Sequence, residues 1–343
     1  MIWLTWRQLR SQAIVAAAAL ATMAVVLAVT GADLATQYRT SGLDACTANC
    51  AAQASNFFAG IKGGATELIF YIGIFLLYAT PALIGMFWGA PLVSRELEAG
   101  TFRLAWSQSV TRTRWLAIKL GLGALGAMAA AGLLSLMISL WSEPLYHAAQ
   151  KAGGNNVLSI SRFSPPLFGA NGIVPIGYAA FAFALGVTVG LLVRRMLPAM
   201  AITLVIFAAV QLLMIGVVRP HLIPPSTTTV PLSAVSMNGE GESNNGQLFL
   251  AVATVNSMAD AWIVSARPVN SAGQPATTVP PACMQTPGVN TFTQCLGSHG
   301  VSIQVRYQPL SRYWALQWLE TAAYLILTGG LGALCYWRIR RLA

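Results

Sequence analysis

Apolar residues gather in six long runs along this chain, and shorter polar segments separate the runs. A helix needs about 20 apolar residues to cross a bilayer, and a helix pairs its own backbone groups in lipid, which an open strand cannot do. The pattern therefore predicts an all-α polytopic membrane protein with six transmembrane helices. We place these helices at 13–30, 68–93, 116–141, 172–193, 197–217 and 314–337.

The composition supports this class, because 56% of the residues are hydrophobic and only 9% are charged. A soluble domain has about a quarter of its residues charged. An alternative for the first run is a cleaved signal peptide, since Arg7 and Arg10 precede the apolar stretch Ala13–Thr30. The run is long for that role, and no small-x-small cleavage site stands out.

The net charge of +10 would suggest a nucleic-acid partner for a soluble protein. Here the placement of the charge gives a different answer. With the N-terminus in the cytoplasm, twelve of the twenty Lys and Arg residues fall in short inner segments. Loops rich in Lys and Arg stay in the cytoplasm, so we expect a multi-pass protein of the cell membrane with both termini cytoplasmic and no nucleic-acid partner. The inner basic residues are Arg7, Arg10, Arg95, Arg103, Arg112, Arg114, Lys119, Arg194, Arg195, Arg338, Arg340 and Arg341.

The polar segments divide the chain into parts. At the start, two tryptophans beside two arginines favour an amphipathic helix on the inner leaflet, in contact with membrane lipid. Pro81, in the second run, predicts a kink because proline cannot donate its backbone hydrogen bond. The expected domains are an interfacial helix at 1–12, transmembrane helices one to five at 13–217, an extracytoplasmic domain at 218–311, and the sixth transmembrane helix with a basic cytoplasmic tail at 312–343.

The two largest outer segments carry weaker signals. Gly31–Thr66 is a loop with one candidate helix, Ala51–Ile61. In 218–311, Val301, Ile303, Val305 and Tyr307 alternate with other residues, which predicts a strand. Weaker strand candidates are Gln247–Val255 and Ala261–Val269.

Four of the five cysteines fall in these outer segments, on the oxidising side where disulfides persist. Four cysteines allow three pairings. We favour Cys46–Cys50 and Cys283–Cys295 because both pairs are local in sequence, and a pairing across the loops remains open. A zinc site at 46–50 is a weaker alternative, since no histidine lies nearby in sequence; we therefore assign no metal site.

Catalytic motifs are lacking in the sequence. It has no G-x-x-x-x-G-K-[ST] phosphate-binding motif, no H-E-x-x-H motif and no Ser-His-Asp spacing. Glu96 and Glu98 do not form a catalytic pair, because residues two apart on a helix do not face each other. We therefore expect a protein that is not an enzyme and binds no cofactor itself.

A charged segment, SRELEAGTFRLAWSQSVTRTRWLAIK at 94–119, lies between the second and third runs. It resembles the cytoplasmic segment of type-2 ABC transporter permeases, which carries an R-E…G-T…[PS]-V-[ST]-R…K pattern, and the six-span layout agrees. The family's E-x-L-L after G-T is replaced by Phe102-Arg103-Leu104-Ala105, and its usual proline by Ser109. The matching residues are Arg95, Glu96, Gly100, Thr101, Ser109, Val110, Thr111, Arg112 and Lys119.

The resemblance implies that a coupling helix at about 94–112 docks in a cleft of a separate cytoplasmic ABC ATPase subunit. Ser94 could cap this helix and Gly100 could end its first half. ATP-Mg would bind in the ATPase, and two permease copies would form a homodimer. The residues expected to contact the ATPase are Arg95, Glu96, Glu98, Gly100, Thr101, Phe102, Arg103, Trp106 and Arg112.

One acid lies inside a predicted span. Glu320 is a few residues into the last run, and Gln317 and Thr321 share its helical face. An ionisable residue at membrane depth is a functional candidate. The plainer interpretation is pairing with an outer arginine such as Arg312. Gln211, in the fifth run, is a similar polar position.

The sequence thus predicts the permease subunit of an ATP-driven ABC exporter, moving a small molecule, drug, lipid or peptide outward. One alternative is a membrane scaffold or sensor subunit without transport, whose outer domain binds a ligand. Another is an intramembrane enzyme that uses Glu320.

Overall fold

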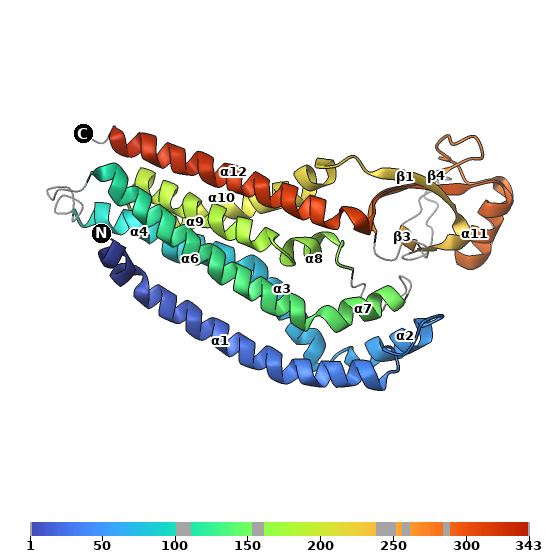
Figure 1. Ribbon diagram of the computed structural model, residues 1–343. Helices are drawn as coiled ribbons and strands as arrows, with labels where there is room; N and C mark the ends of the chain where they lie inside the picture. Colours follow the sequence, from blue (N-terminus) through green and yellow to red (C-terminus); the bar gives the residue numbers. More distant parts are fainter. Residues whose placement is uncertain are drawn as a thin grey trace.

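The computed structural model describes residues 2–100, 111–152, 161–237, 252–255, 261–283 and 289–341. Within these residues, six helical stretches are long and apolar enough to cross a membrane. They pack into a bundle with both chain ends at one end and the strands at the other (Figure 1). The predicted fold class, an all-α polytopic membrane protein with a small β-containing domain, is confirmed.

Two of the six spans run as interrupted helices. The spans are α1 (Ile2–Thr40); α3 (Ala65–Ile84), which continues through the π-helix η1 (Gly85–Gly89) into α4 (Ala90–Glu98); α6 (Arg112–Trp141); α9 (Val174–Val193); α10 (Met196–Leu213), which continues through the π-helix η2 (Met214–Val218) into the 3-10 turn η3 (Arg219–His221); and α12 (Tyr313–Arg340), which the 3-10 turn η7 (Leu310–Arg312) precedes.

The first span differs from its prediction. We expected a separate interfacial helix at 1–12, but α1 runs without a break over 39 residues. At 1.5 Å per residue it is about 58 Å long, well beyond the ~30 Å of a hydrocarbon core. The helix therefore extends past the membrane at one or both ends. The physical reason is that no residue near position 12 breaks a helix.

Helix α9 is the centre of the bundle. Of its most apolar window 83% is buried, against 6% for the first span. Small residues let neighbouring helices approach it closely. A Cβ atom built on Gly186 would lie 2.2 Å from the Gly85 carbonyl oxygen and 2.7 Å from the Ala90 nitrogen, and one on Gly190 would lie 2.5 Å from the Ala90 oxygen. The backbones of α9 and the second span are therefore in direct contact.

The proline of the second span lies one turn before its π-helix. Pro81 is buried inside α3 and has no N–H to donate, and the hydrogen-bond ladder widens to π-helical spacing at Gly85–Gly89. Such widening is a known local cause of helix bending. It places Gly85 and Gly89 against α9, where their lack of side chains is needed.

Short helices cover the opposite end of the bundle from the termini. They are α2 (Ala51–Ile61), which was predicted with these bounds, α7 (Glu143–Lys151) and α8 (Pro165–Ala170). Phe58 of α2 and Leu145 of α7 share one apolar cluster with the ends of α1, α3 and α6. Lys151 donates hydrogen bonds to the carbonyl oxygens of Leu43 and, at 3.1 Å, Cys46. This bonding fixes the α1–α2 link, which the Cys46–Cys50 disulfide also crosses.

The small β-containing domain is inserted between α10 and α12. Its three-stranded sheet has the antiparallel order β1-β5-β4, and β2 pairs with β3. Val230, Ile303 and Val305 form part of its own apolar core, beside the Cys283–Cys295 disulfide. The elements are β1 (Ser226–Pro231), the 3-10 turn η4 (Leu232–Ala234), β2 (Val235–Met237), β3 (Val252–Val255), β4 (Trp262–Val269), the 3-10 turn η6 (Pro281–Cys283), α11 (Val289–Ser298) and β5 (Ser302–Gln308).

Gly186→Ala tests the close contact of α9 with the second span. The added methyl group would overlap backbone atoms, and overpacking of this kind costs about 1–3 kcal/mol. We expect a lower unfolding midpoint in dodecyl maltoside, followed by circular dichroism. The control is Gly121→Ala in α6, where a new Cβ meets nothing within 4 Å; it should be neutral or slightly stabilising. Equal midpoints for the two variants would contradict the packing described.

Replacing both cysteines of the 283–295 pair by serine tests the outer domain. The bond closes a loop with a sequence separation of 12, for which the chain-entropy model gives about 3 kcal/mol. We expect tryptic cleavage after Arg306, within β5, to accelerate at least tenfold. The Cys46→Ser/Cys50→Ser double variant is the control and should leave that site protected. Unchanged protection without the 283–295 bond would mean that the strands are stable without it.

Candidate functional site

The end of the bundle that holds both termini is rich in arginine, and we call it the basic end; the opposite end, next to the strands, is the domain end (Figure 1). The second span, the third span and the α9–α10 turn all reach the basic end. Its described basic residues outside the helix core are Arg7, Arg10, Arg95, Arg112, Arg114, Arg194, Arg195, Arg338, Arg340 and Arg341.

The charged segment begins as the last turns of the second span. Ser94 was expected to cap a separate helix, but it is buried inside α4, and its hydroxyl donates to the Ala90 carbonyl oxygen at 2.8 Å. The prediction that a helix begins at Ser94 was therefore wrong, because α4 begins at Ala90 as a continuation of the second span and Ser94 lies within it. Gly100 does follow the helix end, with a left-handed φ of 70° that suits glycine after a helix.

A buried ion pair joins the second and third spans at the basic end. The Lys119 ammonium nitrogen lies 2.5 Å from the Glu96 carboxylate, with 2% and 18% of the two side chains exposed. Lys119 also lies over the Trp115 ring, 4.5 Å from its centroid. We expected the Glu96 carboxylate to face a partner protein, but it is paired with Lys119 inside the chain. The reason is that an ammonium group at this depth needs an acidic partner.

Glu98 ties the same helix to the α9–α10 turn. Its carboxylate accepts a hydrogen bond from the Met196 backbone N–H at 3.0 Å. That N–H is at the start of α10, where a negative charge is favourable. Arg194 makes the turn possible by adopting a left-handed φ of 57°. Two acids of α4 thus connect the second span to the third span and to α10, the start of the fifth.

Among the other residues predicted to contact an ATPase, the side chain of Arg95 is exposed at the end of α4. Arg112 begins α6, whose first turn is capped by the Thr111 hydroxyl. The structure thus brings these two arginines to the same end of the bundle. Thr101, Phe102, Arg103 and Trp106 lie outside the described residues.

A second buried ion pair lies near the domain end. Arg219, from the end of the fifth span, and Glu320, from the sixth, are 1% and 0% exposed. The guanidinium donates from Nε to Oε2 at 2.8 Å and from Nη2 to Oε1 at 2.9 Å. This is the two-pronged geometry that arginine and carboxylate groups favour.

The remaining polar groups of this site are also paired. Tyr178 of α9 donates to Glu320 at 2.7 Å, and the second guanidinium arm, Nη1, donates to the Pro165 carbonyl oxygen at 2.6 Å. Arg219 also lies over the Phe168 ring, 4.9 Å from its centroid. Gly169 makes this closeness possible, because an added Cβ would lie 2.5 Å from the Tyr78 hydroxyl and 2.9 Å from Nη2 of Arg219. Residues of α8, α9, α12 and the end of the fifth span therefore form one network.

Gln317 extends the network by one helical turn. Its amide oxygen accepts from the backbone N–H groups of Ile173 and Val174, at 3.1 and 3.2 Å, where α9 begins. Its amide nitrogen donates to the Phe168 oxygen at 3.0 Å. Gln317 therefore caps α9 from α12, with Thr321 buried beside it.

Glu320 pairs with an outer arginine, as expected, but the arginine is Arg219. Arg312, the example we named, donates instead to the Pro224 oxygen and to the Gln308 side chain. Sequence reasoning missed Arg219, although it directly follows the fifth apolar run and so lies at a similar depth to Glu320. Glu320 has no exposed surface and accepts three hydrogen bonds, one from the Tyr178 hydroxyl and two from the Arg219 guanidinium.

Gln211 of α10 lies further toward the middle of the bundle and is 7% exposed. The Tyr324 hydroxyl donates to its amide oxygen at 2.9 Å. Its amide nitrogen has no hydrogen-bond partner within the described part of the chain. This position therefore has one donor group left unused.

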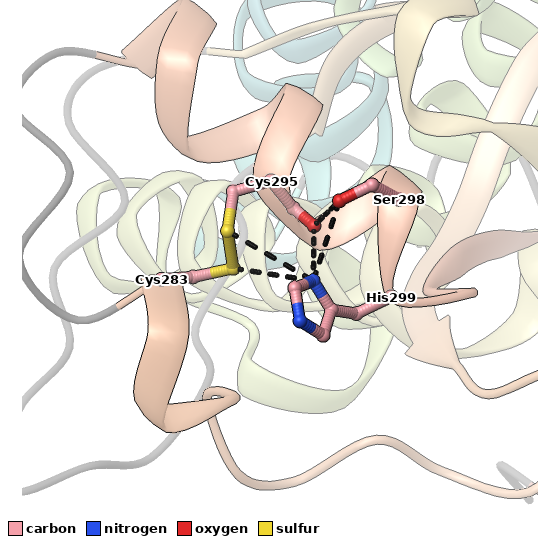
Figure 2. Close-up of a disulfide and its surroundings, with 4 residues drawn as sticks. All are labelled: Cys283, Cys295, Ser298 and His299. Carbon is pink, nitrogen blue, oxygen red and sulfur yellow. Dashed lines mark hydrogen bonds between the residues drawn. A yellow bond between two sulfur atoms is a disulfide. The ribbon is translucent and has the colours of Figure 1, made fainter.

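The disulfides follow the local pairing that the sequence favours, Cys46–Cys50 and Cys283–Cys295. Figure 2 shows His299 beside the second bond, with its Nδ1 atom 3.8 Å from the Cys283 sulfur and 4.0 Å from the Cys295 sulfur. Nδ1 also lies 2.9 Å from the Cys295 carbonyl oxygen. Since the two sulfurs are bonded to each other, neither offers a thiolate to a metal ion in this state.

Glu320→Gln, Arg219→Met and the double variant test the domain-end ion pair. Removing one partner leaves an uncompensated buried charge, which costs about 3–5 kcal/mol. We expect each single change to lower the unfolding midpoint strongly, and the double variant to lose less than the sum of the two. Arg312→Ala should cost only about 1 kcal/mol, since it removes ordinary hydrogen bonds. Additive single effects, or a large effect of Arg312→Ala, would contradict the pairing.

Comparison with known proteins agrees with this arrangement. A family model described as "ABC-2 membrane transporter related" matches residues 17–219, from the first span to the arginine of the ion pair. No curated protein and no solved structure matches the chain. Because the family model covers well over half of the 343 residues, this chain belongs to the ABC-2 membrane transporter related family and is a permease subunit of a transporter.

Proposed function

We propose that this permease is the membrane subunit of an ATP-driven exporter in the cell membrane. Its basic end faces the cytoplasm, so both termini are cytoplasmic and the β-containing domain lies outside. A separate ABC ATPase subunit binds ATP-Mg and docks on the segment 94–119. The substrate is a small molecule, drug, lipid or peptide. The arginine-rich composition of the basic end supports this orientation.

The observation that carries the proposal is the anchoring of the α4 end. Lys119 and Glu96 join the second and third spans, and Glu98 joins α4 to α10. A partner that pushes on the connection between α4 and α6 would therefore move three elements together. A loop attached only by its ends would absorb such a push without moving the helices.

Helix–helix contacts connect the basic end to the domain end and could transmit this movement. The second span lies with its backbone against α9 at Gly186 and Gly190. At the domain end α9 contributes Tyr178 to the ion pair that joins the fifth and sixth spans. Movement of α4 would thus shift α9 and strain the contacts of Arg219 and Glu320. Their separation would open the domain end outward.

The permease works as a pair of copies in this proposal. Gly329, Gly330 and Gly332 of α12 have no heavy atom within 4 Å of a built Cβ. Small residues with open space beside them allow a second helix to approach closely in lipid. A homodimer would bring two basic ends beside two ATPase subunits.

Arg95→Glu tests the docking of an ATPase. The exposed arginine is the residue of α4 best placed for direct contact, and a reversed charge at an interface costs a factor of ten or more in affinity. We expect vanadate-sensitive ATPase activity to co-purify with the tagged permease from its native membrane. At least tenfold less ATPase activity should co-purify with the variant. The permease stripped of partners should hydrolyse no ATP.

Two further variants separate docking from folding. Arg306→Glu, on the exposed face of β5, is the matched charge reversal and should keep its ATPase. Glu96→Gln should lower the unfolding midpoint as well as ATPase recovery, because it breaks the pair with Lys119. An Arg95→Glu protein that retains full ATPase activity would overturn the docking assignment.

A further inference from the structure

Three side chains of the outer domain that can ligate a metal ion lie together: Cys283, Cys295 and His299 (Figure 2). The two sulfur atoms and the Nδ1 atom of the histidine all lie within 4.8 Å of one another. Cys283 ends the 3-10 turn η6, whereas the other two residues lie on and just after α11. In the disulfide the sulfurs bind each other, so only the reduced pair can ligate a metal ion.

The end of α11 places Cys295 and His299 as a pair of ligands. They are four positions apart, and the His299 backbone N–H donates to the Cys295 carbonyl oxygen at 3.2 Å, which continues the helical turn to position 299. Residues at i and i+4 face the same side of a helix, and helical zinc ligands use this spacing. Cys295 is partly exposed and His299 is exposed, so an ion can approach them from water.

Cys283 is held near this helix by contacts other than the disulfide. Its side chain is 1% exposed and belongs to the apolar core of the outer domain, with Val279 and Leu296. Its backbone N–H donates to the Pro280 carbonyl oxygen at 2.8 Å. The Cα atoms of Cys283 and Cys295 are 5.7 Å apart, and rotation about the two Cα–Cβ bonds separates the sulfurs with the backbone in place. The reduced pair therefore stays close to the histidine.

The distances suit a tetrahedral zinc ion. Zinc lies about 2.3 Å from a thiolate sulfur and about 2.0–2.1 Å from an imidazole nitrogen, so a tetrahedral site holds a sulfur and a nitrogen about 3.5 Å apart and two sulfurs about 3.8 Å apart. Nδ1 of His299 is 3.8 Å from the Cys283 sulfur and 4.0 Å from the Cys295 sulfur. The main change that the ion requires is therefore the separation of the two sulfurs.

The histidine can give up its present contact without leaving a polar group unpaired. Nδ1 lies 2.9 Å from the Cys295 carbonyl oxygen. This oxygen can only accept, so Nδ1 carries a proton in the disulfide state. A metal ligand must present a lone pair, so the proton has to move to Nε2 or leave the ring. The carbonyl oxygen then keeps two donors, the Ser298 hydroxyl at 2.7 Å and the His299 backbone N–H.

We propose that the reduced form of this site binds a zinc ion through Cys283, Cys295 and Nδ1 of His299, with water as the fourth ligand. Thiolate and imidazole ligands favour zinc, whereas magnesium and calcium prefer oxygen ligands. The outer domain is thus crosslinked in either redox state, by the sulfur–sulfur bond or by the ion. This inference does not depend on the proposed transport function.

The two states interconvert by a balanced exchange. An external dithiol gives two electrons and two protons to the disulfide, which becomes two thiols, and the dithiol itself becomes a disulfide. Zinc then forms one bond to each sulfur and releases the two thiol protons, with no change in oxidation state. A newly made chain carries the thiols from the start and needs no reductant to bind the ion.

Cobalt titration tests the site, because Co²⁺ replaces zinc and its absorption reports thiolate ligands and tetrahedral geometry. The full chain carrying Cys46→Ser and Cys50→Ser is used in dodecyl maltoside, reduced with a phosphine, so that Cys283 and Cys295 are the only cysteines outside α12. We expect a thiolate-to-cobalt charge-transfer band and tetrahedral d–d bands that saturate at about one equivalent of cobalt and disappear when zinc is added. The oxidised chain, and a chain with Cys283→Ser and Cys295→Ser as well, should show neither set of bands.

His299→Ala tests the third ligand. In the reduced chain it should weaken cobalt binding about tenfold or more, because one of three protein ligands is lost. His221→Ala is the matched control and should leave binding unchanged. The Nδ1 atom of His221 also contacts the carbonyl oxygen four residues before it, and His221 lies outside the ligand cluster found in the described part of the chain. Both variants should keep the wild-type resistance to trypsin in the oxidised state, which shows that they fold.

Tryptic cleavage after Arg306 gives a second readout. Zinc should slow this cleavage about tenfold in the reduced chain, since an ion that binds only the folded domain stabilises it. It should have little effect on the reduced His299→Ala chain. Missing cobalt bands in the reduced chain, bands of equal strength and affinity in His299→Ala, or cleavage that zinc does not slow would overturn the proposed site. None of these readouts uses transport or an ATPase, so the failure of the exporter proposal would leave them standing.

Discussion

The arrangement of the domain end depends on one requirement, that Arg219 and Glu320 neutralise each other out of contact with water. An isolated charge at this depth would be costly, whereas the two-pronged pair satisfies both groups at once. The pair fixes the fifth span against the sixth, and its remaining bonds hold α8 and α9 in place. Gly169 and the α9 cap by Gln317 are the geometric conditions for that pairing.

The basic end repeats the same principle with a second ion pair, in which Lys119 is buried and Glu96 is mostly buried. Lys119 and Glu96 hold the second span to the third, and both belong to the family's motif, so residues proposed for docking also serve packing within the chain. Between the two charged sites lies an apolar middle in which glycine and alanine contacts replace polar ones. A bundle held by charge at both ends and by close backbone contact between them can transmit a displacement along its length.

Much of this fold could be predicted from the sequence, and what failed has a common cause. Apolar runs give the depth of each span, so the six spans, the helix Ala51–Ile61 and the strand near Ile303 were found from local pattern alone. Such local patterns do not show which helices lie side by side in the fold. Arg219 and Glu320 are 101 positions apart, and Glu96 and Lys119 are 23 apart. Their pairing follows from how helices pack, as does the continuation of the second span through Ser94.

The strand pair β1–β5 has a consequence for how the outer domain is attached. β1 leaves the fifth span just after Arg219, and β5 leads into the sixth just before Glu320, with Pro231 opposite Ser302 at the far end. The two strands run antiparallel beside each other, and β4 lies along the other side of β5. The chain segments that leave the fifth span and enter the sixth are therefore joined twice, by backbone hydrogen bonds between β1 and β5 outside the bundle and by the Arg219–Glu320 ion pair inside it. Any motion that separates the two spans has to bend or break this strand pair as well.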